Sequence, residues 1–172
     1  MPAEPVALPT EIRRVLIVGS GTMGQQIGFQ CAGHDCDVVL YDNAPAALES
    51  ARERIADYAD GLVAGGAITA ELSAAAQARI SATADRTAAA ADVDLLCEAI
   101  PEDPALKGRV LAEFDAVCPP RTIFATNTST LLPSQFATAT GRPDRVIACT
   151  STCRYGSPTS PTSCRTRGRL RR

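Results

Sequence analysis

An apolar strand that runs directly into three closely spaced glycines constrains this chain more than any other feature. Residues 13–18 read RRVLIV, a short β-branched run of the kind that a buried parallel strand requires. Gly19, Gly21 and Gly24 follow at once, and residues 25–32 (QQIGFQCA) predict a helix. The pattern therefore predicts a strand, a tight glycine turn and a helix that returns along the strand.

The spacing G-x-G-x-x-G gives each glycine a physical role. Gly19 allows the tight turn off the strand, Gly21 lets the backbone approach a pyrophosphate, and Gly24 lets the helix pack closely on the sheet. The free N–H groups at the start of the helix, near Thr22 and Met23, act with the helix dipole to hold phosphates. We therefore expect these five residues to bind the pyrophosphate of a dinucleotide.

A second strand with an acid at its end completes the unit. Residues 36–41 (CDVVLY) predict that strand, and Asp42 follows 18 residues after Gly24. A carboxylate at this place can accept hydrogen bonds from the adenosine ribose hydroxyls and repels a 2′-phosphate, so Asp42 favours NAD over NADP. A glycine turn that only joins two core strands would not explain the acid.

The rest of the chain alternates between helical and strand patterns. Predicted helices cover 46–64, 69–78, 103–117 and 133–140, and predicted strands cover 80–83, 93–99, 122–125 and 146–148. This alternation predicts an α/β fold with a Rossmann-like, doubly wound, mainly parallel sheet, in which ligands sit at the carboxyl ends of the strands. We expect this domain to cover residues 12–148, after a flexible arm of residues 1–11.

Composition excludes several other classes. The length of 172 residues suits one domain with a core. The seven cysteines have no C-x-x-C spacing and no histidine nearby in metal-binding order, which indicates reduced thiols and no metal site. No apolar stretch approaches the ~20 residues of a membrane span, and the start of the chain does not read as a secretion signal. We expect a cytoplasmic protein without a membrane partner.

Four strings link the chain to a known family. VLIVGSGTMG, LYD, EAIPED and ATNTSTL occur in this order. In order and spacing they resemble the NAD-binding domain of the 3-hydroxyacyl-CoA dehydrogenases, a group that includes the 3-hydroxybutyryl-CoA dehydrogenases. The resemblance covers about residues 11–148. It implies NAD-dependent oxidation of a (3S)-3-hydroxyacyl-CoA to the 3-oxoacyl-CoA, in fatty-acid β-oxidation or butanoate metabolism.

The resemblance also implies roles for four further residues. Glu102 and Lys107 would lie near the nicotinamide half of NAD. Ser129 would hydrogen-bond the 3-hydroxyl of the substrate or the catalytic base, and Asn127 would shape that pocket. The residues by themselves leave other interpretations open. Glu102 could be an acid favoured at a helix N-terminus, and Asn127 and Ser129 could cap a turn.

The catalytic base of the family has no counterpart in this sequence. Removal of a hydroxyl proton suits a histidine, and the resemblance places that histidine at Thr150 and its orienting acid at Thr162. The only histidine is His34, in the turn before the second strand, where we expect it beside the adenine end of the nucleotide site in a structural or solvated role. The chain as written is therefore expected to bind NAD without turnover.

The last residues differ sharply from the rest of the chain. Six of the 17 Lys and Arg residues, and none of the 19 acids, lie after Cys149. Reading from the third base of the Ala148 codon with GC-rich codons gives LHFHVPVWFANVADVMPHA, with His in place of Thr150 and Asp in place of Thr162. We therefore expect residues 149–172 to be a frameshifted, disordered tail. The alternative is a genuine basic arm for nucleic acid or a membrane surface.

A frameshift has consequences for the whole fold. The sheet would be truncated before its last strands, and the helical C-terminal domain that the resemblance implies, with its acyl-CoA cleft and dimer contact, would be absent.

We expect an acyl-CoA substrate and no nucleic-acid partner. Two alternatives remain: a β-hydroxyacid dehydrogenase of the 6-phosphogluconate or 3-hydroxyisobutyrate type, or a non-enzymatic dinucleotide-binding module with a basic interaction tail.

Overall fold

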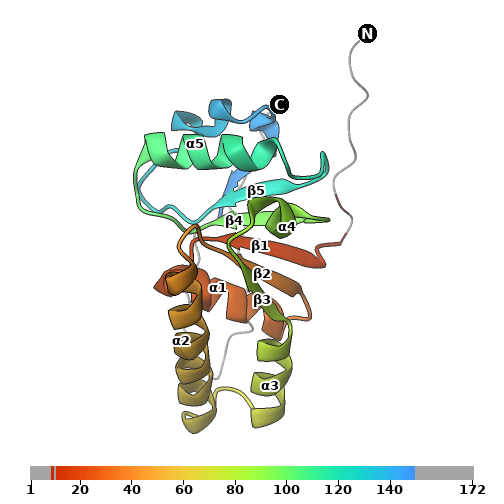
Figure 1. Ribbon diagram of the computed structural model, residues 1–172, viewed down its shortest axis with the longest axis vertical. Helices are drawn as coiled ribbons and strands as arrows, with labels where there is room; N and C mark the ends of the chain where they lie inside the picture. The colour runs from red at the N-terminus through yellow and green to blue at the C-terminus, as the bar shows by residue number, and fades with distance from the viewer. Residues whose placement is uncertain (1–8, 10, 150–172) are drawn as a thin grey trace.

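A sheet of six parallel strands forms the centre of the fold (Figure 1). The computed structural model describes residue 9 and residues 11–149. The strand order β3-β2-β1-β4-β5-β6 is that of a doubly wound dinucleotide fold, which confirms the expected α/β class with a Rossmann-like sheet. The strands are β1 (Arg14–Val18), β2 (Asp37–Tyr41), β3 (Ile80–Thr83), β4 (Leu95–Glu98), β5 (Ile123–Thr126) and β6 (Val146–Ala148).

Helices cover both faces of this sheet. Figure 1 shows α1, α2 and α3 on one face and α4 and α5 on the other. Their bounds are α1 (Thr22–Gly33), α2 (Pro45–Ala64), α3 (Ala70–Ala78), α4 (Arg86–Ala90) and α5 (Pro104–Asp115). Three 3₁₀ turns, Pro133–Gln135, Ala137–Ala139 and Pro143–Arg145, lie between β5 and β6. Among the described residues, no helix combines the length and apolar character that a membrane span requires.

The apolar run of β1 is explained by its position between the two layers. Val15 and Ile17 belong to the core cluster on the side of α1, α2 and α3, whereas Leu16 and Val18 belong to the cluster that includes Phe114 of α5. Successive side chains of a strand point to opposite faces, and both faces of β1 are covered, which explains why its buried residues Val15 to Val18 are all apolar.

The structure differs from the sequence prediction in two elements. Residues 133–140 form 3₁₀ turns instead of one helix: the backbone N–H of Phe136 bonds to the oxygen of Pro133, and that of Ala139 to the oxygen of Phe136. Helix α4 was not predicted because it spans only five residues. The side chain of Asp85 caps it by accepting hydrogen bonds from the next turn.

The described residues end close to the sheet. The N–H of Cys149 donates to the oxygen of Thr126 at 3.0 Å, so regular hydrogen bonding continues one residue past β6. The predicted arm at residues 1–11 and the predicted tail at 149–172 lie almost entirely outside the described residues.

Candidate dinucleotide-binding site

A cavity of about 560 Å³ lies at the carboxyl ends of β1, β2 and β4. Residues 18–23, 41–43 and 99–101 supply one side of it, and side chains of α4 and α5 supply the other. Of the predicted cofactor residues, five line this cavity: Gly19, Gly21, Thr22, Met23 and Asp42. The fold thus gathers the glycine turn and the acid of β2 around one space, at the strand ends where doubly wound sheets bind ligands.

The turn after β1 requires glycine at its first position. Gly19 has φ +106°, and a Cβ atom there would lie 2.7 Å from the carbonyl oxygen of Ala99. Its N–H donates to the oxygen of Tyr41 at 2.8 Å, which ties the turn to the end of β2. A side chain at this position would therefore be strained by its backbone angle and by contact with the chain that leaves β4.

The other two glycines differ in what surrounds them. A Cβ on Gly24 would lie 2.0 Å from the carbonyl oxygen of Gly19, so this position allows α1 to pack against the turn. A Cβ on Gly21 would meet no described atom within 4 Å. Gly21 is the N-cap of α1, and within the described residues no side chain caps this end and no acid lies in the first turn. The helix therefore presents uncapped N–H groups, with an open approach, to an anion in the cavity.

Asp42 is fixed against the same turn. Its Oδ2 accepts hydrogen bonds from the N–H of Ser20 at 2.9 Å and from the hydroxyl of Ser20 at 2.8 Å. Its Oδ1 accepts from the N–H of Ala44 at 3.1 Å. Ser20 was not singled out in the sequence, although it lies inside the glycine motif. The carboxylate is thus held at the edge of the cavity, where a ribose could reach it.

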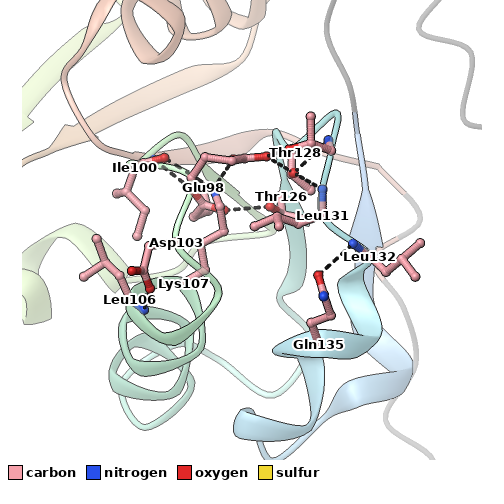
Figure 2. A network of polar contacts seen from close by, with 12 residues as sticks. Glu98, Ile100, Asp103, Leu106, Lys107, Thr126, Thr128, Leu131, Leu132 and Gln135 are labelled. Carbon is pink, nitrogen blue, oxygen red and sulfur yellow. Dashed lines mark hydrogen bonds and ion pairs between the residues drawn. The ribbon is translucent and has the colours of Figure 1, made fainter.

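A second group of predicted residues lies beyond the cavity, at the ends of β4 and β5. Its centre is a fully buried ion pair, with Glu98 0% and Lys107 1% exposed. The ammonium Nζ of Lys107 lies 2.7 and 2.9 Å from the two carboxylate oxygens of Glu98 and 3.3 Å from the oxygen of Ile100. Glu98 also accepts the hydroxyl of Thr126 at 2.6 Å and the N–H of Ile100 at 2.7 Å; Figure 2 shows these groups converging.

This burial changes the expectation for Lys107. The sequence placed Lys107 near the nicotinamide half of NAD, as a cofactor-binding residue. In the structure its side chain has no surface to offer a ligand, since its ammonium is enclosed by carboxylate and carbonyl oxygens. Its main partner is Glu98, which was not among the predicted site residues. An acid inside the apolar run of β4 was the available signal, because a buried charge requires a partner.

Glu102 links the buried pair to the next loop. One of its oxygens, Oε2, lies 3.1 Å from the ammonium of Lys107. The other, Oε1, accepts the hydroxyls of Thr128 and Thr130, the latter at 2.8 Å. The hydrogen bond from Thr128, followed by those from Thr130 and Lys107, lowers the pKa of Glu102 to about 2, against the opposite effect of partial burial. The loop after β5 is thereby fastened to the loop after β4.

The low pKa of Glu102 predicts a pH dependence of stability. A depressed carboxyl pKa stabilises the fold above the unfolded value near 4.5, and this contribution is lost as the pH falls toward about 2. Because 40% of the side chain is exposed, we expect Glu102→Gln to lower the free energy of unfolding by only ~1 kcal/mol at neutral pH. Urea unfolding of both proteins at pH 7 and pH 3 checks this: the difference should shrink at pH 3, and a constant difference contradicts the assignment.

The two predicted substrate residues lie on the loop that Glu102 holds. The backbone N–H of Asn127 donates to the backbone carbonyl oxygen of Glu98 at 2.9 Å, and Ser129 is exposed. Between them, the Thr128 hydroxyl oxygen also accepts the N–H of Leu131 at 3.0 Å, which closes the turn (Figure 2). Thr128 was not predicted. The turn-capping side chain is therefore Thr128, while Ser129 is left open to solvent.

Two positions concern a histidine: His34 itself, and Thr150, where the resemblance places the catalytic base. His34 follows the C-terminal end of α1, whereas the cavity lies at its N-terminal end, so the expectation that His34 sits beside the adenine end is wrong. A 12-residue helix separates the two ends by ~18 Å. Thr150, in the place of the family base, lies outside the described residues.

Comparisons with known proteins show the family to which the chain belongs. Residues 14–150 match the family described as "3-hydroxyacyl-CoA dehydrogenase, NAD binding domain". The chain is 36% identical over 135 residues to 3-hydroxyadipyl-CoA dehydrogenase of Escherichia coli, covering 78% of this chain and 28% of that protein. It is 33% identical over 137 residues to 3-hydroxybutyryl-CoA dehydrogenase of Mycobacterium tuberculosis, covering 79% and 48%.

A further relative and a solved structure extend the comparison. L-carnitine dehydrogenase of a Pseudomonas species is 32% identical over 157 residues, covering 88% of this chain and 44% of that one. The crystal structure of (S)-3-hydroxybutyryl-CoA dehydrogenase from Ralstonia eutropha has a TM-score of 0.76 at 34% identity, covering 81% of this chain and 49% of that chain. The chain thus spans less than half the length of these curated relatives. On the match over residues 14–150, it belongs to the family of 3-hydroxyacyl-CoA dehydrogenase NAD-binding domains, whose members are NAD-dependent oxidoreductases.

Proposed function

We propose that this domain binds NAD and that the protein it represents oxidises a (3S)-3-hydroxyacyl-CoA to the 3-oxoacyl-CoA. The observation that carries the proposal is the cavity that joins the uncapped start of α1 to the carboxylate of Asp42. The N–H groups from Gly21 onward would hold the pyrophosphate, and Asp42 would accept the ribose hydroxyls. The open space in front of Gly21 fits such a ligand.

The chemistry follows from the position of the second loop. When bound, NAD supplies the acceptor for the hydride that leaves C3 of the substrate. A dinucleotide that starts at Asp42 and crosses the glycine turn leads toward residues 99–101, and from there to Glu102. Asn127 and Ser129 would lie at that end, with the exposed Ser129 hydroxyl available to the 3-hydroxyl of the substrate.

We also propose that the catalytic base and its orienting acid are encoded in a shifted frame after Ala148. The support is the restored string with His at the position of Thr150, together with the absence of acids after Cys149 in the sequence. The DNA that encodes the chain decides the matter: loss of one base near the Ala148 codon is expected, and a shifted frame that does not read H-F-H-V-P overturns the idea. The 172-residue chain should accordingly produce no NADH from a 3-hydroxyacyl-CoA.

Asp42 should determine the choice between NAD and NADP. Asp42→Ala removes hydrogen bonds to the ribose and the charge that repels a 2′-phosphate, so we expect NAD affinity to fall ~10-fold or more while NADP binding falls less or rises. Calorimetric titration of both dinucleotides into both proteins measures this. Asp42→Asn is the matched variant, because it removes the charge and keeps one of the two oxygen acceptors that bond to Ser20 and Ala44. An unchanged ratio of the two affinities would contradict the role of Asp42.

A second candidate substrate is a 3-hydroxy acid that carries no coenzyme A. It is favoured by the L-carnitine dehydrogenase relative, which is matched over 88% of this chain. After frame restoration, NADH production with 3-hydroxybutyryl-CoA and with L-carnitine distinguishes the two.

We further propose a cytoplasmic location and neither a nucleic-acid nor a membrane partner. Cell fractionation and a salt-dependent DNA-binding assay test these points.

A further inference from the structure

The buried ammonium of Lys107 is unusual in this chain. Lys107 is the only lysine, and the other 16 of the 17 basic residues are arginines. All of its acceptors come from the loop after β4 or from the end of β4 itself: Glu98, Ile100 and Glu102. A compact ammonium with three protons suits such a closed set of oxygens, whereas a guanidinium carries five N–H groups in a rigid plane.

The contacts of Lys107 connect two parts of the candidate site. Toward the strands, Glu98 holds the hydroxyl of Thr126 at the end of β5 and the N–H of Ile100, which lines the cofactor cavity. Toward the surface, Glu102 holds the hydroxyls of Thr128 and Thr130. We call the three charged residues Glu98, Glu102 and Lys107 the carboxylate clamp (Figure 2, in which Glu98 and Lys107 are labelled).

The clamp does not itself line the cavity. Neither Glu98, Glu102 nor Lys107 contributes to the described cavity wall. Any effect on a ligand must therefore pass through the segments that the clamp joins: residues 99–101, which line the cavity, and residues 127–130, which carry Asn127 and Ser129. Two carboxylates share one ammonium, and each of them also holds one or more threonine hydroxyls of the β5 side. The separation of the two segments is set by these bonds.

We infer that Lys107 is a positioning residue, which acts through Glu102 to hold the Asn127–Thr130 loop at the nicotinamide end of the bound cofactor. The inference rests on the proposed function, because it requires that a dinucleotide occupies the cavity. It predicts that the clamp affects the nicotinamide half of the ligand and leaves the adenosine diphosphate half, held by the glycine turn and Asp42, unaffected.

A comparison of NAD with ADP-ribose separates this role from a purely structural one. ADP-ribose lacks the nicotinamide and keeps the contacts to Gly21 and Asp42. The test protein is the double variant Glu98→Gln and Lys107→Met, which removes both buried charges so that neither is left unpaired. In it Glu102 has lost its ammonium partner. We expect ADP-ribose affinity within about twofold of wild type and NAD affinity lower by about tenfold, a ratio worth ~1.4 kcal/mol.

Two controls make the outcomes distinct. Asp115→Asn weakens a partly buried ion pair with Arg142 away from the clamp, so it lowers stability and should leave the ratio of the two affinities unchanged. Fluorescence of bound NADH gives a second readout at the nicotinamide, which the double variant should alter. If wild type binds both ligands and the double variant has the same ratio of NAD to ADP-ribose affinity, the clamp is only structural. That result contradicts the inference and leaves the proposed function intact. If wild type binds neither, the proposed function falls and the inference with it.

Discussion

Lys107→Met is expected to destabilise the domain by about 3–5 kcal/mol, the cost of leaving one member of a buried ion pair without its partner. Glu98 is fully buried, and two of its hydrogen bonds come from Lys107. Without the ammonium, the carboxylate keeps only the Thr126 hydroxyl and the Ile100 N–H as donors. Urea unfolding at pH 7, followed by circular dichroism, measures the loss as a lower midpoint at unchanged slope.

The matched control removes the second charge as well. Glu98→Gln combined with Lys107→Met should recover most of the lost stability, because an uncharged amide and a thioether of similar size require no ionic partner. If the single Lys107→Met variant unfolds at the same urea concentration as wild type, the ion pair does not stabilise this domain. If the double variant is as unstable as the single one, the cost is due to packing and not to charge.

Gly24→Ala is the second substitution that should strongly destabilise the domain: we expect it to lower the free energy of unfolding by ~3 kcal/mol. Its Cβ would lie 2.0 Å from the carbonyl oxygen of Gly19 and 3.2 Å from a methyl group of Ile17, so α1 would have to move away from the turn. The carbonyl oxygen of Gly19 belongs to the backbone of the turn directly after β1, so it cannot move aside as the end of a flexible side chain can. Thermal unfolding gives the size of the effect.

The same helix offers a matched control for this substitution. A Cβ on Gly28 would lie 3.4 Å from a methyl group of Val38 and 3.5 Å from Ile17, which is ordinary contact. Gly28→Ala should therefore be neutral, or stabilising by up to ~1 kcal/mol from its greater helix propensity. Equal losses at Gly24 and Gly28 would mean that the close approach of α1 to the turn is not the cause.

The first half of the site was predictable because its determinants are local in sequence. Gly19, Gly21 and Gly24 act through backbone angles and the absence of a Cβ, and the end of the continuous apolar run of β1 fixes where the turn must lie. Asp42 follows from the end of the second strand. The structure added Ser20, whose two hydrogen bonds to Asp42 depend on β1 and β2 being neighbours in the sheet.

The second half was only partly predictable because its contacts join distant segments. Glu98 and Thr126 lie 28 residues apart and meet because β4 and β5 pair in register. No pattern in the sequence states that Lys107 points into the fold instead of toward a ligand; burial against Glu98 decides it. The position of His34 was predicted wrongly for a related reason, since a helix of 12 residues carries the chain to the opposite edge of the sheet.

Titration of NAD into the wild-type chain, followed by calorimetry and by the shift in unfolding temperature, shows whether this domain binds the dinucleotide. Binding to the cavity formed by the glycine turn and Asp42 predicts saturation at one NAD per chain and a rise in unfolding temperature that grows with NAD concentration. A chain that unfolds cooperatively, and therefore is folded, yet gives neither saturable heat nor a shift at millimolar NAD would contradict NAD binding in this cavity.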